Sequence, residues 1–310
     1  MSPLEQAMHD YLQLRRSLGY DLAEAHWLLP SFVSFLDAQG ATTVTVATAL
    51  AWAQQPAGRG GLSVVPRRMT MVRGFARYLA GTDPATEIPP LGLVPHRPHW
   101  RAPFLFTPTD VDLMLAEAGR SLASPLRAAT YQSLLGLLAA SGLRIGEALK
   151  LDRSDIDWHE GVLLIRESKF HKSRLVPLQP SSLSALRSFE QVRDRLQPSP
   201  LEPSFFTSLT RKRLLYAVVA QVFRRLVDDV GIGAGAPSPP RLHDLRHSFA
   251  IRTLISWYQA GEDVQAKLPS LSTYLGHREP AHTYWYLSAS PQLLALAAAR
   301  QNGAWLAARS

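Results

Sequence analysis

The 310-residue chain contains no cysteine and no long run of apolar residues. The absence of cysteine excludes disulfides, thiolate metal sites and a cysteine nucleophile. The longest apolar stretch, around Leu134–Ala140, is far too short to span a bilayer. The first residues, Met1–Arg16, are polar and mixed in charge, unlike the basic and then apolar sequence of a secretory signal. From these absences we expect a soluble intracellular protein.

Positively charged residues outnumber negatively charged ones. The chain has 33 Lys and Arg against 25 Asp and Glu, a net charge of +8, and 46% of its residues are hydrophobic. This composition is typical of a folded protein, and the length suffices for two domains. A basic excess favours a polyanionic partner such as nucleic acid, an acidic membrane surface or an acidic protein. Many basic proteins bind none of these, so charge alone does not decide.

Residues 1–82 are predicted to form an N-terminal helical domain. Apolar residues recur at helical spacing in four segments, which begin near Leu4, Leu22, Ala47 and Met69. Pro30, inside the second segment, should kink a helix or mark the start of one. The fourth segment also carries a stripe of basic side chains: Arg67, Arg68, Arg73 and Arg77. This stripe is a solvated face in the simplest interpretation, or a phosphate-neutralising face if the chain binds DNA.

Residues 83–103 contain six prolines, which exclude a regular helix. We expect an interdomain linker that either tracks along DNA or packs on its own protein. A second domain, residues 104–310, begins with a helical stretch over Leu126–Ala140 that ends at Gly142. A β hairpin with strands at Val162–Ile165 and Arg174–Leu178 follows. Helical patterns then resume at 182–196, 214–230, 243–258, 281–287 and 292–300, so the predicted fold class is mainly α with one small β hairpin or sheet.

Four separated segments carry candidate chemistry. Arg144 follows the helix-ending Gly-Leu and begins a new helix, and Lys169 lies at the tip of the hairpin. His243 and Arg246, in His-Asp-Leu-Arg, lie one helical turn apart on the same face. His277 completes a Leu-Gly-His, and a tyrosine follows nine residues later, at position 286.

Together these segments resemble the tyrosine recombinase (phage integrase) family. In that family an Arg after Gly-Leu, a Lys on a β hairpin, a His-x-x-Arg, a Leu-Gly-His and a later Tyr converge on one scissile phosphate. Each fragment alone is unspecific, but all five in this order would rarely occur by chance. The resemblance covers Phe104–Leu287, and the N-terminal region adds a looser likeness to the helical core-binding (SAM-like) domain of the family. It implies a two-domain clamp around duplex DNA.

The resemblance also implies the roles of the site residues. Arg144 and Arg246 would clamp the non-bridging phosphate oxygens, because a guanidinium fork matches phosphate and keeps its proton. Tyr286 would attack phosphorus and form a phosphotyrosine, with His243 as general acid and base. His277 would donate a hydrogen bond to the phosphate, and Lys169 would protonate the leaving 5′ oxygen. No metal or nucleotide cofactor is implied, since two arginines and a lysine supply the positive charge.

Several alternatives remain open at this stage. His243 and His247 are four residues apart, which also suits a metal pair, although no third ligand is evident. Tyr284 is a rival nucleophile, but the spacing from His277 favours Tyr286. Further residues have less specific assignments: Lys172 is a rival to Lys169, Lys172 and Arg174 are candidates for DNA contact, and Glu147 and Asp155 are expected to support the fold and the Arg144 loop.

The expected function is site-specific recombination of double-stranded DNA by an enzyme encoded on a mobile element and acting in the bacterial cytoplasm, at the nucleoid. Two duplexes and four strand cuts imply a homo-tetramer on DNA, formed from a protein that is monomeric in solution, and accessory proteins remain an open question. The helix of residues 292–300 has an apolar face suited to exchange between protomers. The segment Gln259–Ser272 is longer than in compact family members, which predicts a reshaped loop before His277. A type IB topoisomerase and a non-catalytic DNA-binding relative are the alternatives.

Overall fold

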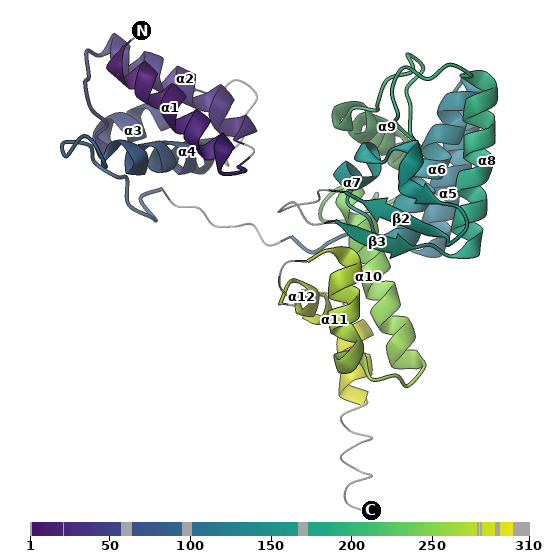
Figure 1. Ribbon diagram of the computed structural model, residues 1–310. Coiled ribbons are helices and arrows are strands. Elements are labelled where there is room, and N and C mark those ends of the chain that lie inside the picture. Colours follow the sequence, from purple (N-terminus) through teal and green to yellow (C-terminus); the bar gives the residue numbers. More distant parts are fainter. Residues whose placement is uncertain are drawn as a thin grey trace, which may run out of the picture. The chain divides into compact units, whose positions relative to one another are not determined.

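A computed structural model of the protein describes residues 2–20, 22–56, 64–94, 101–166, 173–277, 279, 281–288 and 292–299. The chain divides into two compact units, Met1–Trp100 and Arg101–Ser310. Both units are built mainly from helices, and the second also contains one small antiparallel sheet (Figure 1). The predicted fold class is therefore confirmed. Within the described ranges, no helix is both long and apolar enough to cross a membrane.

The described residues of the first unit form four helices, namely α1 Pro3–Ser17, α2 Ala23–Ala38, α3 Val46–Ala53 and α4 Val64–Leu79. Capping boxes at Ser2 and Thr45 satisfy backbone N–H groups that would otherwise be unpaired at the starts of α1 and α3. The helices share one apolar core, in which the rings of Phe32 and Trp52 lie 5.0 Å apart. Helix α2 continues through Pro30, so this proline does not mark a helix start.

The first part of the proline-rich segment packs on the N-terminal unit. The Thr43 hydroxyl donates to the Asp83 carboxylate, and the Glu87 carboxylate accepts from the N–H of Val46 at the start of α3. The Arg73 guanidinium donates to the carbonyls of Pro89 and Pro90. Of the two alternatives for the proline-rich segment, tracking along DNA or packing on its own protein, residues 83–90 therefore show the packing.

The second unit is organised around α6. Helix α6 packs against α5, α8 and α10 (Figure 1). The helices of this unit are α5 Pro108–Ser121, α6 Pro125–Ser141, α7 Ile145–Lys150, the 3₁₀ turn η1 Arg153–Asp155, α8 Pro180–Leu196, α9 Tyr216–Asp229, α10 Leu242–Gln259, α11 Val264–Leu275 and α12 Ala281–Ser288. Residues 292–299 are also helical.

The sheet has the strand order β1-β2-β3, with β1 at Ile156–Asp157, β2 at Val162–Ile165 and β3 at Arg174–Pro177. Neighbouring strands are antiparallel, and Leu163 lies opposite Val176 with both side chains buried. The hairpin predicted from the sequence is therefore present, and its two strands carry the chain towards the Lys169 segment. Strand β1 was not predicted, because two residues give no alternating pattern.

Ahead of His277 the structure contains a helix that the sequence patterns did not predict. Residues 259–272 comprise the end of α10, a short turn and most of α11. Asp263 caps α11 through the N–H of Ala266, and the helix buries Leu268, Leu271 and Leu275 at helical spacing. Pro269 lies inside α11 and masks this signal in the sequence.

Candidate active site

Two chain junctions and the start of α10 meet where the sequence motifs lie. Gly142, with φ at 63°, ends α6 in the left-handed conformation, and Arg144 follows as the N-cap of α7. Gly276, with φ at 69°, ends α11 in the same way and precedes His277. Arg246 projects from the first turns of α10 towards both junctions, because it donates to the carbonyls of Gly142 and Leu275.

The two candidate phosphate-binding arginines are fixed by protein acceptors. Nη1 and Nη2 of Arg246 lie 2.8 Å and 2.6 Å from the carbonyl oxygens of Gly142 and Leu275, and the residue is only 2% exposed. Nη2 of Arg144 lies 2.9 Å from the Gly276 carbonyl, and its Nη1 lies 2.8 Å from Oε1 of Glu147. Burial, together with the charge of Arg144, lowers the pKa of Arg246 to about 10, so it remains protonated at neutral pH.

Glu147 anchors this arrangement from α7. Its carboxylate accepts from the backbone N–H of Arg144 and from the guanidinium groups of Arg144 and Arg174. Burial alone would raise the pKa of Glu147, but the hydrogen bonds and charges of the two arginines outweigh it and hold the pKa below its ordinary value. Glu147 therefore stays ionised, as the predicted support of the Arg144 loop requires.

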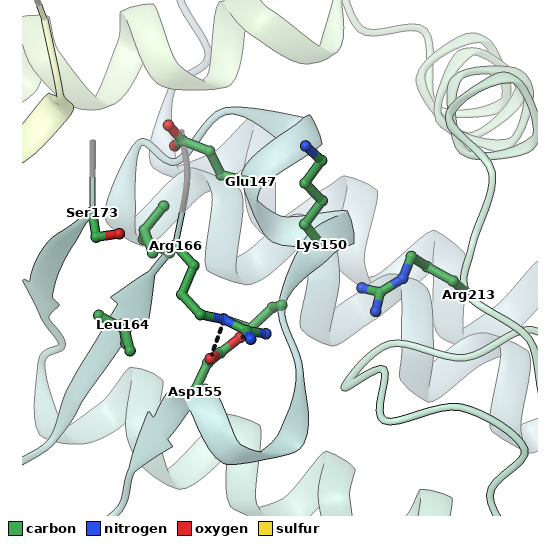
Figure 2. A pocket seen from close by; sticks show the side chains of 9 residues that line it. Glu147, Lys150, Asp155, Leu164, Arg166, Ser173 and Arg213 are labelled. Atoms are coloured by element: carbon green, nitrogen blue, oxygen red, sulfur yellow. Dashed lines mark hydrogen bonds and ion pairs between the residues drawn. The ribbon is translucent and has the colours of Figure 1, made fainter. Parts of the chain in front are cut away.

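A cavity of about 600 Å³ lies beside Glu147 (Figure 2). In Figure 2, Glu147 and Lys150 come from the same helix, α7, and Arg213 comes from a separate segment. The Arg166 side chain points towards Asp155. The Arg166–Asp155 ion pair, at 2.8 Å, ties the end of β2 to η1 and so supports the fold. Ser173, the first described residue after the segment with Lys169, also lines the cavity.

Tyr286, on α12, is close enough to Arg144 and Arg246 to be affected by their charges. It is 2% exposed, whereas Tyr284 on the same helix is 49% exposed. The Tyr286 ring lies 6.0 Å from the ring of His277 and 5.5 Å from that of His247. Burial raises the pKa of the Tyr286 phenol, while the charge and hydrogen bond of Arg246 and the charge of Arg144 oppose this rise. Of the two candidate tyrosines, Tyr286 is therefore the buried one, and its phenol is subject to the charges of both arginines.

His247 of α10 adjoins Tyr286, and His243 lies one helical turn before His247. The rings of His243 and His247 lie 4.7 Å apart at right angles. Solvent reaches the His243 side chain, but its packed surroundings and the charges of Arg246 and Arg144 lower its pKa to about 4. Burial and the neighbouring His243 lower the pKa of His247 to about 4 as well. Both rings are therefore neutral at pH 7. Within the described chain, no group of three or more His, Cys, Asp or Glu side chains is arranged to hold a metal ion.

His277 is oriented by its neighbour on α12. Its Nδ1 lies 2.7 Å from the hydroxyl of Thr283, a fully buried side chain. Lys169 and its rival Lys172 lie outside the described residues. The structure thus brings Arg144, His243, Arg246, His277 and Tyr286 together, from segments separated by up to 142 positions in the sequence.

The arginines predicted to contact DNA have other partners. Arg67 pairs with Glu24 at 2.7 Å, and Arg68 donates to the carbonyls of Trp52, Ala53 and Gln55 at the end of α3. As described above, Arg73 binds the proline-rich segment. Arg77 is exposed, as is Arg67.

Arg174 is also occupied within the protein. Its Nε lies 2.8 Å from the Tyr274 carbonyl, and two further nitrogens bind the Glu147 carboxylate. Sequence reasoning gave Arg174 a place among the DNA contacts and did not connect it with the Arg144 loop. A basic residue two positions beyond a lysine-rich hairpin gives no sign of these buried acceptors.

Comparisons with known proteins agree with this geometry. Residues 106–292 match the model of the phage integrase family. The y4rB protein of Sinorhizobium fredii, named for an inferred integrase/recombinase activity, is 42% identical over 98% of this chain and 99% of its own. The tyrosine recombinase XerC of Alcanivorax borkumensis is 33% identical over 89% of this chain and 84% of its own.

The fold is also found in a solved structure. The lambda integrase tetramer bound to a Holliday junction superposes with a TM-score of 0.59, at 16% identity, over 91% of this chain and 76% of that chain. At this identity the likeness concerns the fold. The family model, which covers more than half of the chain, and the two relatives together establish that the protein belongs to the phage integrase, or tyrosine recombinase, family.

Proposed function

We propose that the protein is a site-specific DNA recombinase that cleaves and rejoins duplex DNA through a covalent 3′-phosphotyrosine at Tyr286. The observation that carries this proposal is the position of a buried tyrosine, which packs against the rings of His247 and His277 and lies close enough to two guanidinium groups for their charges to oppose the rise in the pKa of its phenol. A phenol enclosed by fixed positive charge is suited to attack a phosphodiester, because the same charges stabilise the phenolate and the phosphorane-like transition state.

In the proposed cleavage step, the phenolic oxygen of Tyr286 forms a bond to phosphorus as the bond from phosphorus to the 5′ oxygen breaks. Ionising a free tyrosine at pH 7 costs about 4 kcal/mol, so the phenolic proton needs an acceptor. We assign this role to His243, as the family resemblance implies; its ring is neutral at pH 7 and can therefore take up a proton. We assign the proton donor for the 5′ oxygen to Lys169. Rejoining is the same step in reverse, with a 5′ hydroxyl as the attacking group.

Arg144 and Arg246 are assigned to the non-bridging oxygens of the same phosphate. Each guanidinium has donors beyond those that bind the protein carbonyls, so phosphate binding does not require these contacts to be given up. His277 is the proposed third donor. We assign to His277 the tautomer in which Nδ1 accepts from the Thr283 hydroxyl and Nε2 carries the ring proton that would be donated to a phosphate oxygen.

We further propose that the N-terminal unit and the catalytic unit close around double-stranded DNA, with Arg77 among the phosphate contacts of α4. Recombination joins two duplexes through four strand cuts, so the active assembly is proposed to be a homo-tetramer on DNA. The solved lambda integrase tetramer provides an example of such an assembly in this fold. We infer a mobile-element origin and action in the bacterial cytoplasm, at the nucleoid, where the substrate DNA lies.

The test uses a plasmid with two directly repeated copies of the DNA that flanks the gene. Purified protein is expected to excise the intervening segment in the presence of a metal chelator, and to leave a plasmid without the flanking DNA unchanged. Relaxation of both plasmids without excision would indicate a topoisomerase instead. Binding to the flanking DNA without any cleavage would indicate a non-catalytic relative.

A further inference from the structure

The C-terminal end of α11 is held by three arginines that come from three different elements. The carbonyls of three consecutive residues, 274, 275 and 276, each accept one hydrogen bond from a different guanidinium. The distances are 2.8 Å from Arg174, 2.6 Å from Arg246 and 2.9 Å from Arg144. Carbonyls at a helix C-terminus lack intrahelical partners and carry partial negative charge, so they are natural acceptors for cations.

Arg174 differs from the other two because its donor edges are taken up by the protein. Nε donates to the Tyr274 carbonyl, and Nη1 and Nη2 donate to the two oxygens of Glu147 at 3.0 Å and 2.9 Å. Its side chain is 10% exposed. A guanidinium that is bidentate to a carboxylate and also bound through Nε presents little to an incoming phosphate.

Gly276 provides the space for this arrangement. A Cβ atom at this position would lie 2.8 Å from Nη1 and 2.9 Å from Cζ of Arg174. The positive φ of 69° also disfavours any other residue at the turn. The glycine of the Leu-Gly-His segment therefore lets the Arg174 guanidinium approach the helix end while its own carbonyl binds Arg144.

We propose that Arg174 is a positioning residue for strand cleavage, not a DNA contact. Arg174 opens β3, two residues after the hairpin segment with Lys169. Through Glu147 it fixes Arg144, and through the Tyr274 carbonyl it fixes the turn that carries His277. Arg174 thereby holds the start of β3, Arg144 and the turn before His277 in fixed positions relative to one another. This inference rests on the proposed recombinase function and assigns a further residue to it.

The test compares Arg174→Lys with Arg166→Lys in the full-length protein. Lysine retains the charge that neutralises Glu147, but it cannot make the bidentate contact and the Tyr274 contact together. Arg166 is the matched control, because it lies at the end of the paired strand β2 and forms its own ion pair with Asp155, outside the Arg144 network. Two quantities are measured on a nicked suicide substrate: noncovalent affinity against salt concentration, and the adduct-forming rate at saturating protein.

Arg174→Lys is expected to bind DNA within about 3-fold of wild type with the same salt dependence, and to form the adduct roughly 10–100-fold more slowly, as for a misplaced catalytic group. Arg166→Lys should leave the saturated rate unchanged. Because Arg174 acts through Glu147, combining Arg174→Lys with Glu147→Gln should cost less than the product of the two separate effects. Gly276→Ala, which displaces the guanidinium but retains Arg174, should resemble Arg174→Lys.

A weaker affinity of Arg174→Lys for DNA with an unchanged saturated rate would make Arg174 a DNA contact and overturn the inference. Multiplicative effects of the Arg174 and Glu147 variants would also overturn it, as would a parallel loss of thermal stability and DNA binding. An active wild type with an equally active Arg174→Lys rejects this inference alone. A wild type that forms no adduct rejects the proposed function and the inference together.

Discussion

Gly142 supports both the fold and the site, and its replacement by alanine has effects that follow from the structure. A Cβ atom there would lie 2.5 Å from Cδ1 of Phe249 and 3.2 Å from Cδ2 of Leu275. The left-handed conformation costs a non-glycine residue about 1–2 kcal/mol, and overpacking a core costs about 1–3 kcal/mol. We therefore expect Gly142→Ala to lower the free energy of unfolding of the catalytic unit by roughly 2–5 kcal/mol, as the sum of these two costs.

The assay is thermal unfolding, with Gly146→Ala as the matched control. For a domain of this size, each 1 kcal/mol shifts Tm by about 2–4 °C, so Gly142→Ala should lower Tm by roughly 4–20 °C. Gly146 is helical and a Cβ atom there would meet nothing within 4 Å, so its alanine variant should be as stable as wild type or slightly more stable. A Gly142→Ala protein that unfolds within about 1 °C of wild type would refute the reasoning from the left-handed turn and the Phe249 contact.

Two further predictions concern pH and the basic stripe of α4. His243 and His247 take up protons near pH 6.5 when unfolded but only near pH 4 when folded, so stability is complete above about pH 6.5 and falls as the pH is lowered towards 4. The urea midpoint of the DNA-free protein should therefore be lower at pH 5 than at pH 7.5, and an equal difference in a variant with both histidines changed to Gln would contradict this cause. Arg68→Leu should destabilise the N-terminal unit by about 1–3 kcal/mol, because three carbonyls lose their donor, without changing the salt dependence of DNA binding. Arg77→Leu should instead reduce the salt slope by about 1 with little change in stability, and the reverse pattern in salt titrations and unfolding curves would show that the two roles are exchanged.

The sequence was informative where a local signal coincided with the tertiary structure. The end of α6 at Gly142 and the strands of the hairpin follow from local residues: a glycine after an apolar helical stretch, and alternating apolar runs on either side of a polar tip. Helix α11 was missed because Pro269 interrupts its pattern. Helix α5 was missed although Thr107 and Asp110 form a capping box at its start, a signal that could have located it.

The hydrogen-bond partners of the basic side chains were the feature that the sequence predicted least well. The stripe on α4 has the spacing of a DNA-binding face, yet Arg68 and Arg73 donate to backbone carbonyls from distant parts of the same unit. The acceptors of Arg174 lie 27 and 100 positions away in the sequence. Backbone carbonyls have no sequence signature. The sequence alone therefore does not show whether a basic residue near a motif binds DNA or a carbonyl of its own protein.

The most direct measurement of the central claim is the mass of the active-site peptide after reaction with a nicked suicide substrate in a metal chelator. Wild type and Tyr284→Phe are predicted to yield a nucleotide adduct on the peptide that contains position 286, and Tyr286→Phe is predicted to yield none while binding the same DNA. An adduct that persists in Tyr286→Phe, or one that maps to Tyr284, would contradict the assignment of Tyr286 as the nucleophile.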